Sequence, residues 1–179
     1  NKVLVNIMEW NYEFDVVVVG SGNGALTAAL CSHDGGAKTL VIEKSSQFGG
    51  TSATSGGGVW IPNNRYAMAE NVDDSDQDAR DYINSVSPEG MIKDELIETY
   101  ISEGPRMVDY LHENSQVKYR NLAHYPDYFP DNTGGKEGNR SMEPEPIFGT
   151  ELGDDLGNLR EQHPQTAFTM GPINMNFTQ

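Results

Sequence analysis

The residues best suited to chemistry form a glycine-rich turn between two apolar segments. Gly20-Ser21-Gly22-Asn23-Gly24-Ala25 matches the pattern G-x-G-x-x-G/A, with alanine in the last position. Gly20 permits a tight turn, Gly22 lets a pyrophosphate approach the backbone, and Ala25 lets a helix pack closely on a strand. The unpaired N–H groups at the start of that helix would face the phosphates. The turn therefore predicts a dinucleotide site to which all six residues contribute.

An acidic residue stands at the spacing that such a site requires. Glu43 follows Gly20 by 23 residues and ends the second apolar segment. Its carboxylate can accept hydrogen bonds from ribose hydroxyls and would repel a 2′-phosphate, which disfavours NADP. The alternative is a glycine-rich turn in an unrelated α/β fold. The strand-to-helix context and the spacing of Glu43 argue against that alternative.

A second run of glycines and hydroxyls follows at once, over residues 44–58. A plain NAD site does not need such a run, whereas FAD extends beyond the first turn and needs more backbone donors and close approach. A flexible surface loop is the alternative. We therefore expect FAD to be bound by Lys44, Ser45, Gly50, Thr51, Ser52, Ser55, Gly56, Gly57 and Gly58.

The elements expected to position these residues alternate in type. The apolar segments Phe14–Val19 and Thr39–Glu43 read as parallel strands on either side of a helix at Ala25–His33. We therefore expect an α/β, Rossmann-like FAD-binding domain with a parallel sheet and flanking helices. Farther along we expect a short strand at Val59–Pro62, a helix at Asp74–Val86 with Ser75 as N-cap, helices at Lys93–Ser102 and Pro105–Asn114, and an edge strand at Val117–Asn121.

Composition narrows the class of protein. With 12 basic and 27 acidic residues the net charge is −15, which disfavours binding to nucleic acid. The single cysteine, Cys31, cannot form an internal disulfide, and its apolar helical surroundings predict a buried core thiol. No segment is apolar enough for a membrane span and no secretory signal is visible, so we expect a cytoplasmic protein. His33, His112, His124 and His163 lack metal-ligand spacing and read as surface or cap residues, and no metal site is expected.

Two stretches of the sequence resemble a known family. The run from Phe48 through Gly49-Gly50-Thr51-Ser52 to Trp60-Ile61-Pro62-Asn63-Asn64, and the later stretch with Tyr125-Pro126-Asp127-Tyr128-Phe129-Pro130, Gly134-Gly135 and Gly138–Pro144, carry the likeness. They resemble the 3-ketosteroid Δ1-dehydrogenases of the succinate dehydrogenase/fumarate reductase flavoprotein superfamily. The double-glycine motif is specific to the superfamily, and the Trp-Ile-Pro-Asn-Asn extension is more specific to the subfamily.

That resemblance implies a reaction. Members remove two hydrogens from C1 and C2 of a 3-ketosteroid A-ring, with a tyrosine taking a proton from C2, a hydride passing from C1 to flavin N5, and an electron acceptor reoxidising the FAD. One tyrosine of the site lies in the Asp-Tyr segment, and the matching residue here is Tyr128, with Tyr125 as the alternative. Thr51 and Ser52 stand in the region where some relatives attach FAD through a histidine. The resemblance therefore implies non-covalent FAD.

Members of the family are much longer than this chain. We therefore expect residues 1–13 to be an N-terminal extension and residues 14–179 to be the N-terminal portion of the FAD-binding domain, with the substrate domain and the general base outside the chain. Two alternatives stay open: a fumarate reductase or succinate dehydrogenase-like enzyme, and a non-catalytic FAD-binding fragment.

Overall fold

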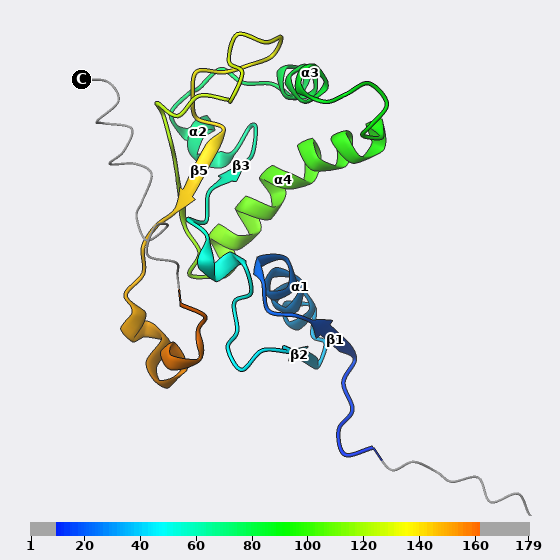
Figure 1. Ribbon diagram of the computed structural model, residues 1–179, viewed down its shortest axis with the longest axis vertical. Coiled ribbons are helices and arrows are strands. Elements are labelled where there is room, and N and C mark those ends of the chain that lie inside the picture. The colour runs from blue at the N-terminus through cyan, green and yellow to red at the C-terminus, as the bar shows by residue number, and fades with distance from the viewer. Residues whose placement is uncertain (1–9, 162–179) are drawn as a thin grey trace, which may run out of the picture. The chain divides into compact units, whose positions relative to one another are not determined.

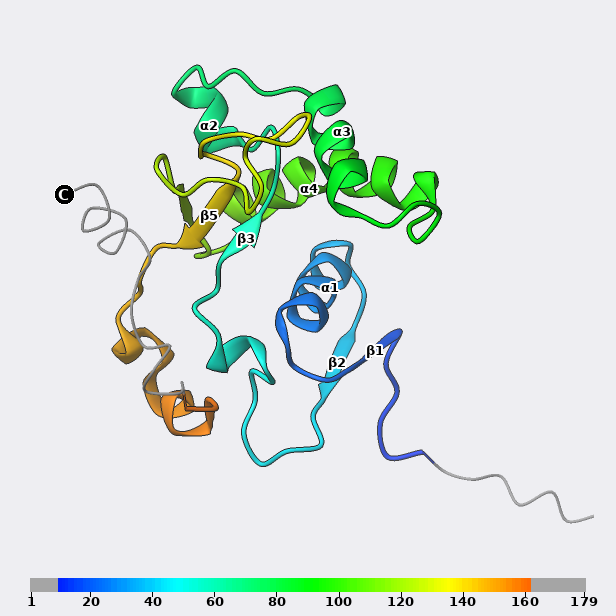
Figure 2. The ribbon, with the colours of Figure 1, turned by 45° about the horizontal axis from the view of Figure 1, so that its top comes forward.

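The computed structural model describes residues 10–161, which form two compact units (Figures 1 and 2). Of the described residues, the first unit takes in 10–54 with 152–161, and the second takes in 55–151. Of the expected N-terminal extension, only residues 10–13 lie within the described part of the chain, and His163 lies outside it.

The first unit is built around a strand, a helix and a second strand. Strand β1 (Val16–Val19) leads into helix α1 (Asn23–Asp34), and strand β2 (Thr39–Ile42) pairs with β1 in parallel. Val16 and Val18 are half-buried while Val17 and Val19 are exposed, so α1 covers one face of this sheet (Figure 2). The predicted parallel pairing of the two strands is confirmed.

The prediction that Cys31 is buried is wrong. Its thiol is exposed, and α1 contains no buried residue. The helix has only a two-stranded sheet to pack against among the described residues of its unit, so the side of the helix that carries Cys31 is left open.

The remainder of the first unit lies in segments far apart in the sequence. A short 3₁₀ helix, η1 (Ser52–Thr54), follows the double glycine. A second 3₁₀ segment, η2 (Gly149–Asn158), belongs to the first unit from Leu152 onward and is interrupted at Gly153, and just after it Leu159 forms a parallel bridge with Phe48. This bridge brings the end of the described chain back to the double-glycine loop.

The second unit holds an antiparallel sheet and three helices. Strands β3 (Val59–Trp60), β5 (Ser141–Pro144) and β4 (Tyr119–Asn121) pair in that order. Helices α2 (Arg65–Ala69), α3 (Asp76–Val86) and α4 (Asp94–Asn114) complete it (Figure 1). The predicted strand near residue 119 does lie at an edge, whereas β5 and the antiparallel pairing were not predicted. Two apolar clusters form the core: Ile61, Val108 and Met142 in one, and Ala79, Ile97 and Ile101 in the other.

Helix α3 begins as predicted. The Ser75 hydroxyl accepts a hydrogen bond from the Asp78 N–H at 3.0 Å, which satisfies one of the free donors at the helix start. The negative charges of Asp76 and Asp78 in the first turn also interact favourably with the positive end of the helix dipole and stabilise the helix.

The prediction of two helices over residues 93–114 is wrong. The chain forms one helix, α4, with Pro105 inside it. Proline removes one backbone hydrogen bond and costs a helix interior about 3 kcal/mol. Continuous packing outweighs this cost, because α4 buries a single stripe at helical spacing: Ile97, Ile101, Gly104, Val108 and Leu111.

Replacing Pro105 with alanine is therefore expected to stabilise the protein. The restored N–H can bond to the carbonyl one turn earlier, while the loss of proline stiffness in the unfolded chain offsets part of the gain, leaving about 1–2 kcal/mol. Urea denaturation measures the change, with the exposed Ser102→Ala in the same helix as control. A destabilised Pro105→Ala variant would show that α4 needs the proline.

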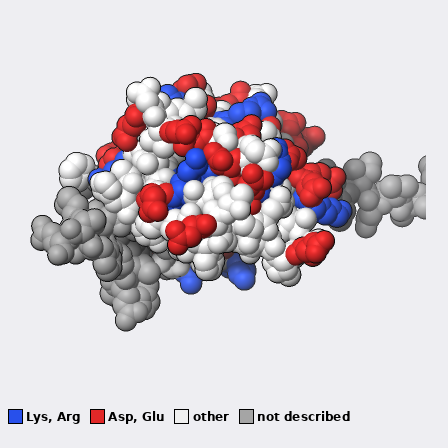
Figure 3. Space-filling model, turned by 90° about the horizontal axis from the view of Figure 1, so that it is seen from above, with Lys and Arg blue, Asp and Glu red and all other residues white. Residues whose placement is uncertain are grey.

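The surface is predominantly acidic. Figure 3 shows Asp and Glu side chains spread over the face in view, with Lys and Arg between them. Among residues 10–161, no helix has the length and apolar character needed to cross a bilayer. Within the same residues, no His, Cys, Asp and Glu side chains gather in a way that could hold a metal ion.

Candidate functional site

The glycine turn has the backbone geometry that its sequence predicted. Gly20 has φ of +96°, a value that side-chain-bearing residues rarely adopt, and its N–H donates to the Ile42 carbonyl at 2.7 Å. A Cβ on Gly22 would stand 3.4 Å from Ser52 Oγ. The missing side chain thus keeps the turn open where the double-glycine loop approaches it.

The expectation of a free N–H at the helix start needs one correction. The Asn23 N–H donates to Ser52 Oγ at 3.0 Å, so η1 caps the helix from a distant part of the chain. Gly22, at the N-cap position, makes no side-chain cap. Ser52 is therefore part of the site through the helix it caps.

Ser21 connects the three segments of the site. Ser21 is 2% exposed, and its hydroxyl donates a hydrogen bond to Glu43 Oε2 at 2.5 Å. Ser21 Oγ also accepts a hydrogen bond from the Gly49 N–H at 2.9 Å. The turn, the end of β2 and the double-glycine loop thereby hold one another in place. The side chain of Ser21 accordingly positions Glu43 and the double-glycine loop at the cleft.

Glu43 is held in its charged form. The hydrogen bond from Ser21, and next the one from the Ser45 N–H at 3.0 Å, keep the pKa of the Glu43 carboxyl below its ordinary value of 4.5. Each carboxylate oxygen retains acceptor capacity beyond these bonds. The group can therefore accept hydrogen bonds from ligand hydroxyls.

These residues enclose a cleft of about 710 Å³ in the first unit. Asn23, Gly24 and Ala25 do not line it and contribute through the helix start. The open backbone at Gly22 and the ionised Glu43 fit the diphosphate and ribose of FAD. Of the predicted ligands, the cleft contains Gly20, Ser21, Gly22, Glu43, Lys44, Ser45, Gly50, Thr51 and Ser52.

Arg160 also lines this cleft and was missed by the sequence analysis. Its N–H donates to the Phe48 carbonyl at 2.9 Å, next to the bridge between Phe48 and Leu159. The two partners lie 112 positions apart in the sequence, so no local pattern could have found them.

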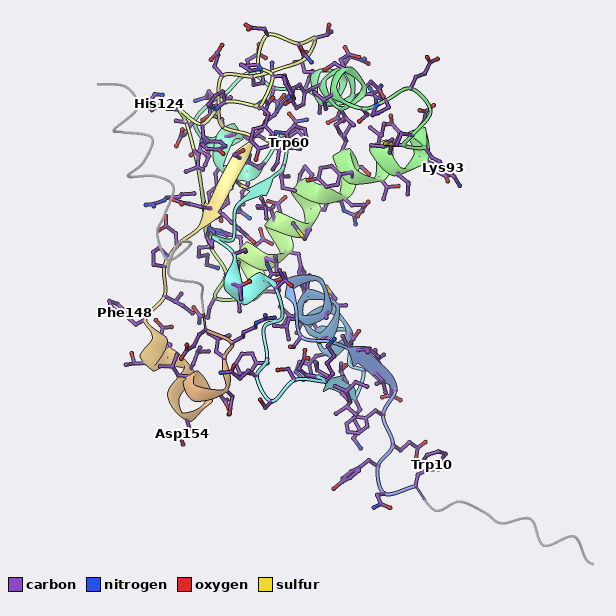
Figure 4. The ribbon with its side chains drawn as sticks, in the orientation of Figure 1. Trp10, Trp60, Lys93, His124, Phe148 and Asp154 are labelled. Carbon is purple, nitrogen blue, oxygen red and sulfur yellow. The ribbon has the colours of Figure 1, made fainter. Side chains whose placement is uncertain are left out.

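A second, apolar cavity of about 640 Å³ lies in the second unit, and its lining includes the predicted residues Ser55, Gly56, Gly57, Gly58 and Tyr128. Trp60 lies in its wall, among side chains from the sheet and from α3 (Figure 4). Its ring centroid is 5.8 Å from that of Tyr82 and 6.2 Å from that of Tyr100. The lining includes Ser55, Gly56, Gly57, Gly58, Trp60, Tyr82, Leu122, Tyr125, Tyr128, Phe129 and Met142.

A buried ionic network stands behind this wall. Arg140, 1% exposed, donates to Asp74 at 2.6 and 3.0 Å and to Asp127 at 2.9 Å. Asp127 also accepts the Trp60 indole N–H at 2.6 Å, and the Arg140 guanidinium lies 5.4 Å from the Trp60 ring centroid. The network fixes the Trp60 ring and the residue that precedes Tyr128.

Tyr128 and Tyr125 lie together at the cavity. The Tyr128 side chain is exposed, at 79%, whereas Tyr125 is half-buried. Burial first, and then interaction with Tyr128, raises the pKa of Tyr125 above its ordinary value of 10.0. The Tyr125 phenol therefore stays protonated near neutral pH and can donate a hydrogen bond to a ligand carbonyl.

Within residues 10–161, no histidine lines either cavity. His33 and His124 are exposed, and His112 is half-buried with its Nδ1 2.9 Å from the Tyr66 hydroxyl. Burial lowers the pKa of His112.

Comparison with known proteins identifies the family of the chain. Residues 15–176 match the model of the FAD binding domain family. The chain is 37% identical, over 93% of its length and 29% of the relative, to a 3-oxosteroid 1-dehydrogenase of Mycolicibacterium smegmatis. It is 38% identical, over 88% of its length and 27% of the relative, to a 4-oxocyclohexanecarboxylate 2-dehydrogenase of Sinomonas cyclohexanicum.

A solved structure extends the likeness to three dimensions. A 3-ketosteroid delta1-dehydrogenase from Sterolibacterium denitrificans, in complex with 1,4-androstadiene-3,17-dione, is similar with a TM-score of 0.80 and 41% identity. The match covers 86% of this chain and 27% of that one, so the chain spans less than a third of each of these three relatives. The predicted resemblance and the predicted cofactor, FAD, are confirmed. Because the family model matches most of its residues, the chain belongs to the FAD-binding domain family.

Proposed function

We propose that the protein carrying this chain dehydrogenates 3-ketosteroids at C1–C2, with this chain supplying most of the FAD site. The observation that carries the proposal is the apolar cavity with its paired tyrosines, in a chain that also holds the dinucleotide cleft. A volume of about 640 Å³ is within the range of pockets for small-molecule ligands. The apolar wall and the phenols suit a steroid ring that bears a ketone.

The residues of the first unit would hold the cofactor's nucleotide end. The Glu43 carboxylate would accept hydrogen bonds from the ribose hydroxyls, and the backbone from Gly20 to Ala25 would face the diphosphate. Lys44, Ser45, Gly50, Thr51 and Ser52 complete this end, and Ser55–Gly58 serve the ring end. We propose that binding is non-covalent, since Thr51 and Ser52 stand where some relatives carry a linking histidine. When FAD is bound, its flavin would accept the hydride that leaves C1 of the steroid.

Tyr128 is the proposed catalytic residue of this chain. Its phenol lies at the rim of the apolar cavity and interacts with Tyr125. A phenol O–H directed at the ketone oxygen would stabilise the negative charge that develops there as the C2 proton leaves. An apolar surrounding strengthens this interaction by excluding water. Reoxidation requires a separate electron acceptor.

Glu43→Gln is expected to weaken binding of ADP to the apoprotein about 10-fold, because a charged acceptor is lost from the ribose. It should also narrow the preference for ADP over 2′-phospho-ADP. Because the pKa of Glu43 is lowered, the carboxylate stays charged at every pH above its ordinary pKa of 4.5. Its contribution to ADP binding should therefore be lost only as the pH falls below 4.5. Titration calorimetry measures these changes.

The matched control for Glu43 is Glu13→Gln, an exposed carboxylate of the same unit. Equal ADP affinity in wild type and Glu43→Gln would remove Glu43 from the nucleotide site.

A second candidate substrate is a monocyclic ketone acid, favoured by the likeness to the Sinomonas enzyme. Turnover assays with 4-androstene-3,17-dione and 4-oxocyclohexanecarboxylate separate the two by their kcat/KM. We expect the steroid to be the better substrate and its product to be the 1,4-diene. Faster turnover of the monocyclic acid would replace the steroid assignment.

A further inference from the structure

The cleft of the first unit contains a cation whose role is not explained by the fold. Arg160 reaches the cleft because its own N–H donates to Phe48 and the Phe48 N–H donates to the Asn158 carbonyl at 2.8 Å. These backbone bonds fix residue 160 beside the segment that leads into Gly49 and Gly50. The place of residue 160 at the cleft thus follows from backbone pairing.

The arginines of this acidic chain differ in one respect. Arg65, Arg80, Arg106, Arg120 and Arg140 each pair with at least one carboxylate. Arg160 makes no such ion pair with any residue in the described range 10–161. An exposed arginine that lines a cleft and has no carboxylate partner within residues 10–161 is available to an anionic ligand.

The charges inside the cleft indicate which part of the ligand this is. Its lining contains two basic residues, Lys44 and Arg160, and one acidic residue, Glu43. Glu43 is engaged by Ser21 and Ser45, and the Asn23 N–H is engaged by Ser52. The helix start therefore offers fewer free donors than its motif predicts, and a diphosphate in the cleft would need a cation.

We propose that Arg160 binds the diphosphate of the cofactor. A guanidinium can donate two parallel hydrogen bonds to phosphate oxygens, which a lysine cannot match. This inference rests on the assignment of the first unit's cleft to FAD and adds a ligand from outside the glycine motifs. It predicts that the contribution of Arg160 depends on the phosphates and not on the adenosine or the flavin ring.

The test measures nucleotide affinity in apoprotein prepared from the intact protein. Binding of FAD is followed by flavin fluorescence, and ADP and adenosine are compared as competitors. Arg160→Ala is expected to weaken FAD and ADP about 10- to 100-fold and to leave adenosine unchanged. Arg160→Lys should recover part of the loss. Added salt should weaken FAD binding less in Arg160→Ala than in wild type, because one exposed charge interaction is gone.

Arg106→Ala is the matched control, since Arg106 is exposed and pairs with Glu103 on α4. The thermal midpoints of the apoproteins show whether Arg160→Ala folds normally. Unchanged FAD and ADP affinity, or equal losses for ADP and adenosine, would overturn the proposal while leaving the FAD site intact. Failure of the wild type to bind either nucleotide would overturn the cofactor site itself.

Discussion

Tyr128→Phe is expected to lower the rate of flavin reduction by a 3-ketosteroid about 10²- to 10³-fold, as removal of one hydrogen-bond donor to a developing oxyanion does in other enzymes. The phenol is exposed at the cavity rim, so its loss should leave folding and FAD content unchanged. Single-turnover stopped-flow measurement under anaerobic conditions isolates this step from reoxidation. The loss should appear in the rate at saturating steroid and only weakly in the steroid dissociation constant.

Tyr12→Phe provides the matched control, because Tyr12 is also exposed and lies in the first unit. Tyr125→Phe tests the alternative assignment. If Tyr125→Phe abolishes flavin reduction while Tyr128→Phe keeps the wild-type rate, the catalytic role passes to Tyr125. Wild-type rates in both variants would remove the paired phenols from the reaction.

Arg140→Met is expected to lower the free energy of unfolding by about 3–5 kcal/mol, the usual result of removing one partner from a buried ion network. The substitution leaves Asp74 and Asp127 as buried carboxylates without their cation. It also removes the cation beside the Trp60 ring, so the apolar cavity should lose its steroid affinity as well. Urea denaturation at neutral pH measures the first effect and equilibrium steroid binding the second.

Neutralising the stranded carboxylates should restore much of the stability. The triple variant Arg140→Met, Asp74→Asn and Asp127→Asn is expected to be more stable than Arg140→Met alone. Arg106→Met, which breaks an exposed pair, should cost less than about 1 kcal/mol. A loss for Arg140→Met no larger than that for Arg106→Met would show that the network does not support the wall.

The parts of the fold predicted from the sequence are those set by local pattern. The sequence predicts strands at Phe14–Val19 and Thr39–Glu43 and a helix at Ala25–His33, because an apolar strand, a glycine turn and a small-residue helix follow in direct succession. The structure has these elements at Val16–Val19, Thr39–Ile42 and Asn23–Asp34. Ser75 was identified as a cap from its type and place. These assignments depend on interactions between residues that are only a few positions apart in the sequence.

The parts that were missed depend on tertiary contacts. Pro105 reads locally as a helix start, yet α4 continues through it because residues on both sides pack into the same core. Cys31 reads as buried from its apolar neighbours, yet its thiol is exposed, because among the described residues of its unit the helix packs against one two-stranded sheet. Arg160 and Phe48 meet across more than a hundred residues. Of the site, sequence alone therefore predicted the glycines and Glu43, but not Arg160 or the Arg140 network.

The central claim, FAD-dependent dehydrogenation of a 3-ketosteroid, is tested most directly by anaerobic titration of the purified flavoprotein. One equivalent of 4-androstene-3,17-dione should bleach the visible flavin absorbance, with formation of the 1,4-diene, while succinate should leave the spectrum unchanged. Bleaching by succinate alone would assign the protein to dicarboxylate chemistry. A spectrum that neither compound changes would contradict the steroid assignment.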